Sequence, residues 1–282
     1  MPLRIGIVGL DSSHAVSLVR RCNVRDADSP VRVIAGWPGG SSDAPLSAER
    51  VIGFTDEVRD RCGVEILESP EAVATAVDAV AILSMDGRNH AQLFARVASF
   101  RRPVFVNKPL ATSRHDAERI AETARKHGVR WFSASALRLA AVSAPPARRV
   151  TVQCPLWFEP ANVGWFWYGI HGIELAAAVC GRGISAVRLE TFPDRELLHL
   201  EWRDGHTGTV VGLLNRDAAF TYACDDATAV PVGAHADRLE QAMLDFFAGA
   251  DAPVTTADTL EVIACVAAAN ASRASDGRRI SL

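Results

Sequence analysis

Several features that would define a class of function are absent from this sequence of 282 residues. Basic residues are not in excess, because 30 Lys and Arg stand against 33 Asp and Glu, for a net charge of −3. Such a balance gives no positive field for nucleic acid or anionic lipid. No apolar run approaches the ~20 residues of a membrane span, and a first strand expected from about Leu3 leaves no room for a signal peptide. We therefore expect a cytoplasmic protein that binds a small molecule and has no nucleic-acid or membrane partner.

Cysteines are few and widely spaced, with no C-x-x-C pair that would indicate a zinc or redox site. Their scatter favours reduced, mostly buried thiols over disulfides. We expect no metal site, because the one conceivable set, Asp11, His14 and His90, has no ligand spacing that requires a metal. The six cysteines are Cys22, Cys62, Cys154, Cys180, Cys224 and Cys265.

Two glycines are missing from the turn after the first expected strand. The stretch RIGIVGLDSSH (residues 4–14) starts as a buried strand and ends at Gly9. Dinucleotide-binding turns continue as G-x-G-x-x-G, where the second glycine lets the backbone approach the pyrophosphate and the third permits close helix packing. Here Asp11 and His14 occupy those places. An ionised Asp11 would repel a pyrophosphate by on the order of several kcal/mol unless it turns away, although the Asp-Ser-Ser sequence also suits a helix N-cap.

The end of the second expected strand, residues 31–36, lacks the acid that usually binds the ribose hydroxyls of NAD. A loop of Pro, Gly and Ser residues follows instead and starts at Trp37. Trp37 could stack on a ring, but such loops are more often surface excursions. This departure is a second, independent mark against standard dinucleotide binding.

Strands and helices alternate through the first half of the chain. The alternation predicts a doubly wound parallel sheet of the Rossmann type over residues 1–138. From residue 139 the pattern changes to antiparallel strands beside helices, with an Asp204-Gly205 hairpin turn, which predicts an α+β domain over residues 139–282. Further strands of the first half are expected near residues 64–67, 78–83, 103–106 and 129–133.

Polar side chains follow the expected strands of the first half. The first and fourth strands of a doubly wound sheet flank its switch point, and ligands bind beyond their carboxyl ends. We therefore expect these side chains in one cleft, with His171 of the second domain opposite them. Arg138, after the sixth strand, either binds an anionic substrate or pairs at the domain boundary. The strand-exit residues on this edge are Asp11, His14, Asp86, Arg88, His90, Asn107 and Lys108.

Three motifs resemble the Gfo/Idh/MocA family, in which a Rossmann domain precedes an α+β domain with an open, mainly antiparallel sheet. The sequence VNKPL (residues 106–110) resembles the family's E-K-P, with Asn107 in place of Glu. GIHGIE (residues 169–174) resembles its G-x-H-x-x-D helix, with Glu174 in place of Asp. The tail, residues 246–277, resembles its closing helices, so the likeness covers nearly the whole chain.

The resemblance implies an enzyme that oxidises or reduces a hydroxyl carbon of a sugar, cyclitol or related compound with NAD or NADP. By motif position, Lys108 would hydrogen-bond the reacting hydroxyl and His171 would move its proton. Trp167 stands where some members carry an assisting acid. The open sheet implies a homo-oligomer, by resemblance a homodimer. Cofactor-binding candidates are Gly9, Asp11, Ser12, Ser13, His14 and Asn107. Substrate-binding candidates are Asp86, Arg88, His90, Arg138 and Tyr168.

Two other functions stay open. The opening turn resembles a subset of the family that carries Gly-Leu-Asp-(Ser/Thr)-Ser-His and implies no particular reaction. Asp11 and His14 also suit an enzyme without a nicotinamide, such as an isomerase, lyase, dehydratase or cyclase, and a non-catalytic sensor is a third alternative. His171 could be a core histidine, His90 could cap the helix that follows it, and Glu174 could orient His171. Binding of NAD(H) or NADP(H) would separate these functions.

Overall fold

Contacts divide the chain into two compact units in the computed structural model, which describes residues 2–25, 29–140, 142, 148–233 and 235–282. This division differs from a single cut after residue 138, because residues 134–138 cluster with the second unit and a later segment returns to the first. The first unit comprises Met1–Ala111, His115–Ser133 and Glu240–Val254, and the second comprises Thr112–Arg114, Ala134–Leu239 and Thr255–Leu282.

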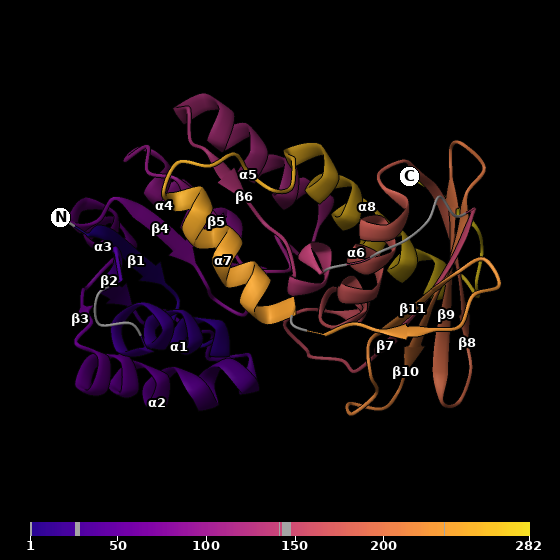
Figure 1. Cartoon of the computed structure of the whole chain (residues 1–282), viewed down its shortest axis with the longest axis horizontal. Helices are drawn as coiled ribbons and strands as arrows, with labels where there is room; N and C mark the ends of the chain where they lie inside the picture. Colours follow the sequence, from indigo (N-terminus) through magenta and orange to yellow (C-terminus); the bar gives the residue numbers. More distant parts are fainter. Residues whose placement is uncertain (1, 26–28, 141, 143–147, 234) are drawn as a thin grey trace. The chain divides into compact units, whose positions relative to one another are not determined.

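The first unit is built on a six-stranded sheet in the order β3-β2-β1-β4-β5-β6 (Figure 1). Every neighbouring pair in this sheet is parallel. Strands β4 and β5 are buried at every residue, as expected for strands covered on both faces. The predicted Rossmann-type sheet is thus confirmed. The strands are β1 (Leu3–Val8), β2 (Val31–Trp37), β3 (Glu65–Ile66), β4 (Ala79–Ile82), β5 (Val104–Val106) and β6 (Trp131–Phe132).

Helices cover both faces of this sheet (Figure 1). The 18-residue helix α2 was not predicted, because only Ser47, Thr55 and Val58 are buried in it and two of these are polar, so the apolar period of a helix is missing. It starts with Pro45 in its first turn and ends at Gly63 in the left-handed conformation (φ 70°). The helices are α1 (Ser13–Arg20), the π-helical turn η1 (Arg21–Arg25), α2 (Pro45–Cys62), α3 (Pro70–Ala76), α4 (His90–Ala98) and α5 (Arg114–His127).

The second unit contains a seven-stranded sheet in the order β12-β11-β7-β10-β9-β8-β13. Among the described strands, only β7 and β10 pair in parallel, so the sheet is mixed and mainly antiparallel, as predicted. The strands are β7 (Arg149–Pro155), β8 (Ile184–Thr191), β9 (Arg195–Trp202), β10 (Thr207–Leu213), β11 (Thr221–Cys224), β12 (Val230–Pro231) and β13 (Ile280–Ser281). The helical segments are η2 (Ala136–Leu139), η3 (Gly164–Phe166), α6 (Gly169–Cys180) and α8 (Thr256–Arg273). Helix α7 (His235–Phe247) begins in the second unit and continues in the first from Glu240.

Two glycines fix α6 against its neighbours. A Cβ on Gly172 would collide with Val210 of β10 and Cys154 of β7, and a Cβ on Gly169 would collide with the ring of Trp165. The helix therefore lies directly on the sheet, and His171, which lies between these glycines, has a fixed position. In Figure 1, α6 and α8 lie on the same side of the sheet.

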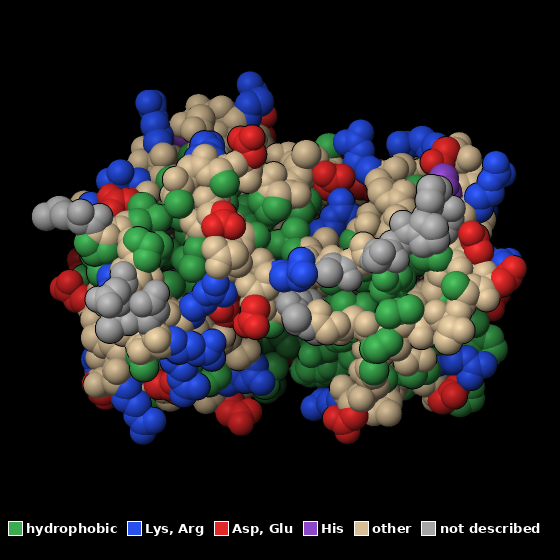
Figure 2. Space-filling view, viewed as in Figure 1, with side chains coloured by type: hydrophobic (Ala, Val, Ile, Leu, Met, Phe, Trp, Pro, Cys, Tyr) green, Lys and Arg blue, Asp and Glu red, His purple; other side chains and the backbone are tan. Residues whose placement is uncertain are grey.

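The surface charges and the cysteines agree with what the sequence indicated. Basic and acidic side chains are interspersed over both units on the face shown in Figure 2. All six cysteines are free thiols. No helix of the described residues is both long enough and apolar enough to cross a membrane.

Candidate functional site

The turn between β1 and α1 keeps the first glycine of a dinucleotide fingerprint. Gly9 has a φ of 95°, and a Cβ there would come within 2.5 Å of the backbone nitrogen of Ser84 at the exit of β4. Only glycine fits this turn, because both the conformation and the space exclude a side chain. Ser12 caps α1, since its Oγ accepts a hydrogen bond of 3.3 Å from the N–H of His14. Ser13 is exposed at the helix N-terminus, where anions bind in this class of fold.

Asp11 points into the protein and not out of the turn. Its side chain has no exposed surface, Oδ2 accepts a hydrogen bond of 2.5 Å from Ser47 Oγ, and Oδ1 accepts one of 3.0 Å from the N–H of Met85. Burial raises the pKa of Asp11, and these hydrogen bonds oppose that shift. Asp11 therefore ties the first turn to α2 and to the exit of β4, and the N-cap is Ser12 instead.

His14 lies in the first turn of α1 and is half-buried. Burial, together with the charge of Lys108, lowers the pKa of His14 to about 4. The imidazole is therefore neutral near pH 7 and close enough to Lys108 to respond to its charge. His14 and Lys108, two candidate residues of the first unit, therefore lie close to each other.

Asp86 and Arg88, both predicted to bind substrate, bind each other. Asp86 is fully buried and accepts hydrogen bonds from Arg88 Nη2 at 2.7 Å and from Ser41 Oγ at 2.6 Å. Burial raises the pKa of Asp86, but these hydrogen bonds outweigh it and the pKa lies below its ordinary value. Arg88 also binds Asp43 at 2.8 Å, so this network holds the loop after β2 to the exit of β4.

His90 is also fully buried, at the start of α4. Its Nε2 lies 2.9 Å from the carbonyl oxygen of Ser84, and its Nδ1 lies 2.9 Å from that of Pro109 and 3.2 Å from that of Leu110. Burial lowers the pKa of His90, and the carbonyl contacts oppose that shift. The ring has no surface for a ligand. It ties the exit of β4 to the residues directly after Lys108.

Asn107 and Lys108 follow β5, as the sequence indicated. Lys108 is only 7% exposed, and its N–H donates a hydrogen bond of 3.0 Å to Asn107 Oδ1. The amide nitrogen of Asn107 lies 3.4 Å from the carbonyl oxygen of Ser84 and 3.5 Å from Ser12 Oγ. Asn107 thus connects the exits of β1, β4 and β5, and the Lys108–Pro109 peptide bond is cis.

In the second unit, His171 lies in the first turn of α6 and is 9% exposed. Its ring centroid lies 5.1 Å from that of Tyr168 and 5.8 Å from that of Phe220. Trp157 extends this aromatic group, with its centroid 5.0 Å from that of Tyr168, and the guanidinium of Arg216 lies over its ring at 4.2 Å. No motif indicated Trp157, Arg216 or Phe220, because they come from the segment after β7 and from the segment before β11.

Glu174 and Arg138 both have partners within the second unit. Buried Glu174 accepts a hydrogen bond from the N–H of Ser135 at the start of η2. Arg138 Nη2 lies 3.3 Å from Asp258 Oδ1 in the first turn of α8, which favours the pairing role for this arginine. Among the described residues, the buried Nη1 of Arg138 has no hydrogen-bond partner. No three His, Cys, Asp or Glu side chains of the described chain gather as a metal site.

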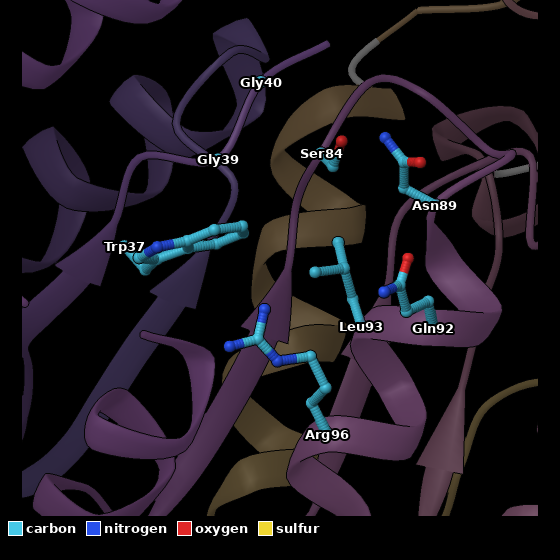
Figure 3. Close-up of a pocket in the computed structure, with 8 residues that line it drawn as sticks. All are labelled: Trp37, Gly39, Gly40, Ser84, Asn89, Gln92, Leu93 and Arg96. Carbon is cyan, nitrogen blue, oxygen red and sulfur yellow. The ribbon is translucent and has the colours of Figure 1, made fainter. Parts of the chain in front are cut away.

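A cavity of about 240 Å³ lies at the exits of β2 and β4 (Figure 3). Ligands bind beyond these strand ends in doubly wound sheets. Trp37 was noted from the sequence, but the α4 residues were not, because nothing in their pattern distinguishes them from an ordinary helix surface. The lining residues are Trp37, Gly39, Gly40, Ser84, Asn89, Gln92, Leu93 and Arg96.

Residues 44–135 match the family model GFO_IDH_MocA, an oxidoreductase family with an NAD-binding Rossmann fold. Inositol 2-dehydrogenase from Cereibacter sphaeroides is 33% identical over an alignment of 150 residues, and the match covers 49% of this chain. The match covers only 37% of that relative's own length.

The fold is similar to solved structures of low sequence identity. Myo-inositol 2-dehydrogenase from Lactobacillus plantarum has a TM-score of 0.77 at 14% identity, over 100% of both chains. Myo-inositol dehydrogenase from Lactobacillus casei, in complex with NAD(H) and myo-inositol, has a TM-score of 0.75 at 15% identity, over 100% of this chain and 97% of that one. At these identities the likeness shows the fold alone. The family-model match and the curated relatives show that part of this chain, residues 44–135 for the model, is similar to the Gfo/Idh/MocA oxidoreductases.

Proposed function

We propose that the protein is an NAD(P)-dependent oxidoreductase that acts on a hydroxyl carbon of a cyclitol, sugar or related compound. The observation that carries this proposal is the inward orientation of Asp11, whose two carboxylate oxygens are bonded to Ser47 and Met85. The sequence raised an electrostatic objection to a dinucleotide at this turn. A buried carboxylate that is hydrogen-bonded inside the protein does not face the pyrophosphate, so this objection no longer applies.

The residues at the strand exits fit a dinucleotide. Gly9 keeps the turn tight, and the N–H groups at the start of α1, near Ser12 and Ser13, would hold the pyrophosphate. The cavity beside Trp37 would hold the adenosine. When bound, a nicotinamide cofactor accepts or donates the hydride of the reaction.

Lys108 and His171 are assigned to the proton chemistry of the substrate hydroxyl. The ammonium of Lys108, almost enclosed by the protein, would hydrogen-bond and polarise the reacting oxygen. His171 would accept the hydroxyl proton during oxidation and return it during reduction. His14, neutral near pH 7 and close to Lys108, is a further group that can bind the substrate or the cofactor.

The substrate class is proposed from the relatives and from the aromatic rings around His171. The curated relatives are inositol 2-dehydrogenases, and one structural neighbour is a complex with myo-inositol. Half-exposed Tyr168, Phe220 and Trp157 offer flat apolar faces to the C–H groups of a ring polyol. The unpartnered Nη1 of Arg138 is a donor that a hydroxyl, carboxylate or phosphate oxygen could satisfy.

A second function is favoured by one observation, the neutral imidazole of His14 next to Lys108. These groups would also serve an isomerase, lyase, dehydratase or cyclase that needs no nicotinamide. Titration with NADH and NADPH, followed by nicotinamide fluorescence and by the unfolding temperature, separates the two functions. The oxidoreductase requires saturable binding and turnover of a polyol. Turnover without added or bound nicotinamide would support the second function, and a folded protein inactive on all substrates would support a sensor.

We also propose a homo-oligomer that forms through the outer face of the second sheet. Leu197 of β9 and Val211 and Leu213 of β10 are half-exposed and alternate with buried residues, which gives this face an apolar centre. Light scattering after size exclusion tests the assembly. A Val211→Glu variant should then run as the monomer, whereas a monomeric wild-type protein would exclude the assembly.

A further inference from the structure

The cavity at the exits of β2 and β4 is lined by a positively charged side chain, Arg96, that the proposed reaction does not use. Arg96 reaches it from the outer surface of α4, and its guanidinium carbon lies 5.6 Å from the centroid of the Trp37 ring. Figure 3 shows the guanidinium directed toward Trp37, with Leu93 and Gln92 beside it. The lining residues include no Asp or Glu, so Arg96 is the one charged side chain among them.

Glu71 fixes the orientation of this guanidinium by binding the edge formed by Nε and Nη2. Its two carboxylate oxygens accept hydrogen bonds of 2.7 Å from Nε and Nη2 of Arg96. The guanidinium holds the pKa of Glu71 at about 2, so the pair is fully ionised at neutral pH. A guanidinium is a planar fork with five N–H donors. With one edge occupied by Glu71, the donors of Nη1 are left for a ligand.

The loop after β2 is a second feature that bears on which ligand the cavity binds. An acid at the end of β2 binds the ribose hydroxyls of NAD and repels a 2′-phosphate, but here Trp37 ends the strand and two glycines follow Pro38. A Cβ on Gly39 would come within 2.9 Å of the Trp37 ring and 3.5 Å of Gly9 Cα. The loop therefore passes close to the first turn, and its two glycines place no side chain there.

We propose that this cavity binds the adenosine 2′-phosphate of NADP(H), with Arg96 as the phosphate-binding residue, so that the protein prefers NADP(H) to NAD(H). The inference rests on the proposed function in that a nicotinamide dinucleotide is the ligand. Arg binds phosphate through parallel charge-assisted hydrogen bonds, and Trp37 offers an aromatic face to the adenine in the same cavity. If Arg96 merely packed against Trp37 or the adenine, the two cofactors would bind equally.

Dinucleotide fragments test this assignment without any turnover. Calorimetric titration should show that 2′,5′-ADP binds about tenfold to a hundredfold more tightly than 5′-AMP, because charged hydrogen bonds contribute about 1.5–3 kcal/mol and each 1.4 kcal/mol is tenfold. In Arg96→Gln this ratio should fall to within about threefold. Arg125→Gln is the matched control, since Arg125 of α5 makes the same Nε and Nη2 pair with Glu122 on the surface of the first unit.

Arg96→Lys keeps the positive charge but loses the planar fork, so its ratio of affinities for 2′,5′-ADP and 5′-AMP should lie between those of the wild type and Arg96→Gln. This variant provides the test if Arg96→Gln does not fold. NADPH and NADH, titrated by fluorescence, should show the same order. An unchanged ratio in Arg96→Gln, equal affinity of the wild type for both fragments, or no binding of 2′,5′-ADP would overturn the proposal. Turnover with NADH alone would support the oxidoreductase function and overturn the phosphate site at Arg96. A preference for the 2′-phosphate without redox activity would support the phosphate site and argue against the oxidoreductase function.

Discussion

The inward orientation of Asp11 makes a quantitative prediction about both stability and cofactor affinity. Asp11→Ala removes the acceptor of two buried donors, Ser47 Oγ and the N–H of Met85. Each unsatisfied buried donor costs about 1–3 kcal/mol, and release of the buried charge offsets part of this loss. We expect the free energy of unfolding to fall by about 2–5 kcal/mol.

The affinity for NAD(P)H should change by less than about threefold, because the carboxylate does not face the pyrophosphate. A carboxylate that did face it at about 4 Å would repel it by about 4 kcal/mol at an effective dielectric constant of 20, and its removal would tighten binding by more than about a hundredfold. Stability and affinity therefore separate the two orientations of Asp11 in one variant.

Urea unfolding of the wild type, Asp11→Ala, Ser47→Ala and the double variant measures the bond directly. A coupling of about 1 kcal/mol or more is expected for residues in one buried network. Asp43→Ala is the control, because Asp43 is exposed and pairs with Arg88 on the surface, so it should cost less than about 1 kcal/mol. Additive losses at Asp11 and Ser47, or an Asp11→Ala protein that is as stable as the wild type and binds NAD(P)H much more tightly, would refute this reasoning.

Three further predictions concern buried polar groups. His90→Phe removes the ring nitrogens that lie 2.9 Å from the carbonyl oxygens of Ser84 and Pro109, so turnover should fall about tenfold or more, with a shift of the pH profile. His90→Gln should restore part of it, and equal kinetics of both variants and the wild type would contradict this. The His14 pKa of about 4 lies below the unfolded value of 6.5, so the folded state binds fewer protons between these values and stability should fall as pH drops from 6.5 to 4; the fall should be smaller in His14→Asn, and an NMR titration of His14 centred near pH 6.5 would exclude the low pKa. Glu174→Gln keeps an acceptor for Ser135 and should cost less than about 1 kcal/mol, whereas Glu174→Ala should cost about 1–3 kcal/mol; equal losses in thermal unfolding would argue against the bond.

The parallel sheet could be predicted from the sequence because strands covered on both faces are continuously apolar. Residues 79–82 and 104–106 are such runs, and both are buried throughout. Helix α2 could not be predicted, since its buried residues include Ser47 and Thr55, which bind Asp11 and the backbone of Val51. The return of Glu240–Val254 to the first unit depends on contacts between residues far apart in the chain.

The places of the candidate residues along the strands could be predicted from the sequence, but the directions of their side chains could not. Motif spacing placed Lys108 and Asn107 correctly after β5, where parallel strand ends meet. It could not show that Asp11 turns toward Ser47, 36 residues away, or that Arg138 pairs with Asp258. It also missed Arg96, because only the fold brings that helix surface beside Trp37.

Equilibrium titration of the wild-type protein with NADPH and NADH tests the central claim most directly. We expect saturable binding of one dinucleotide per chain, with a dissociation constant in the micromolar range for NADPH, and reduction of NADP⁺ when a cyclitol or sugar substrate is added. The reduction should be lost in Lys108→Met while dinucleotide binding remains. Absence of binding by both dinucleotides at millimolar concentration would contradict the proposed function.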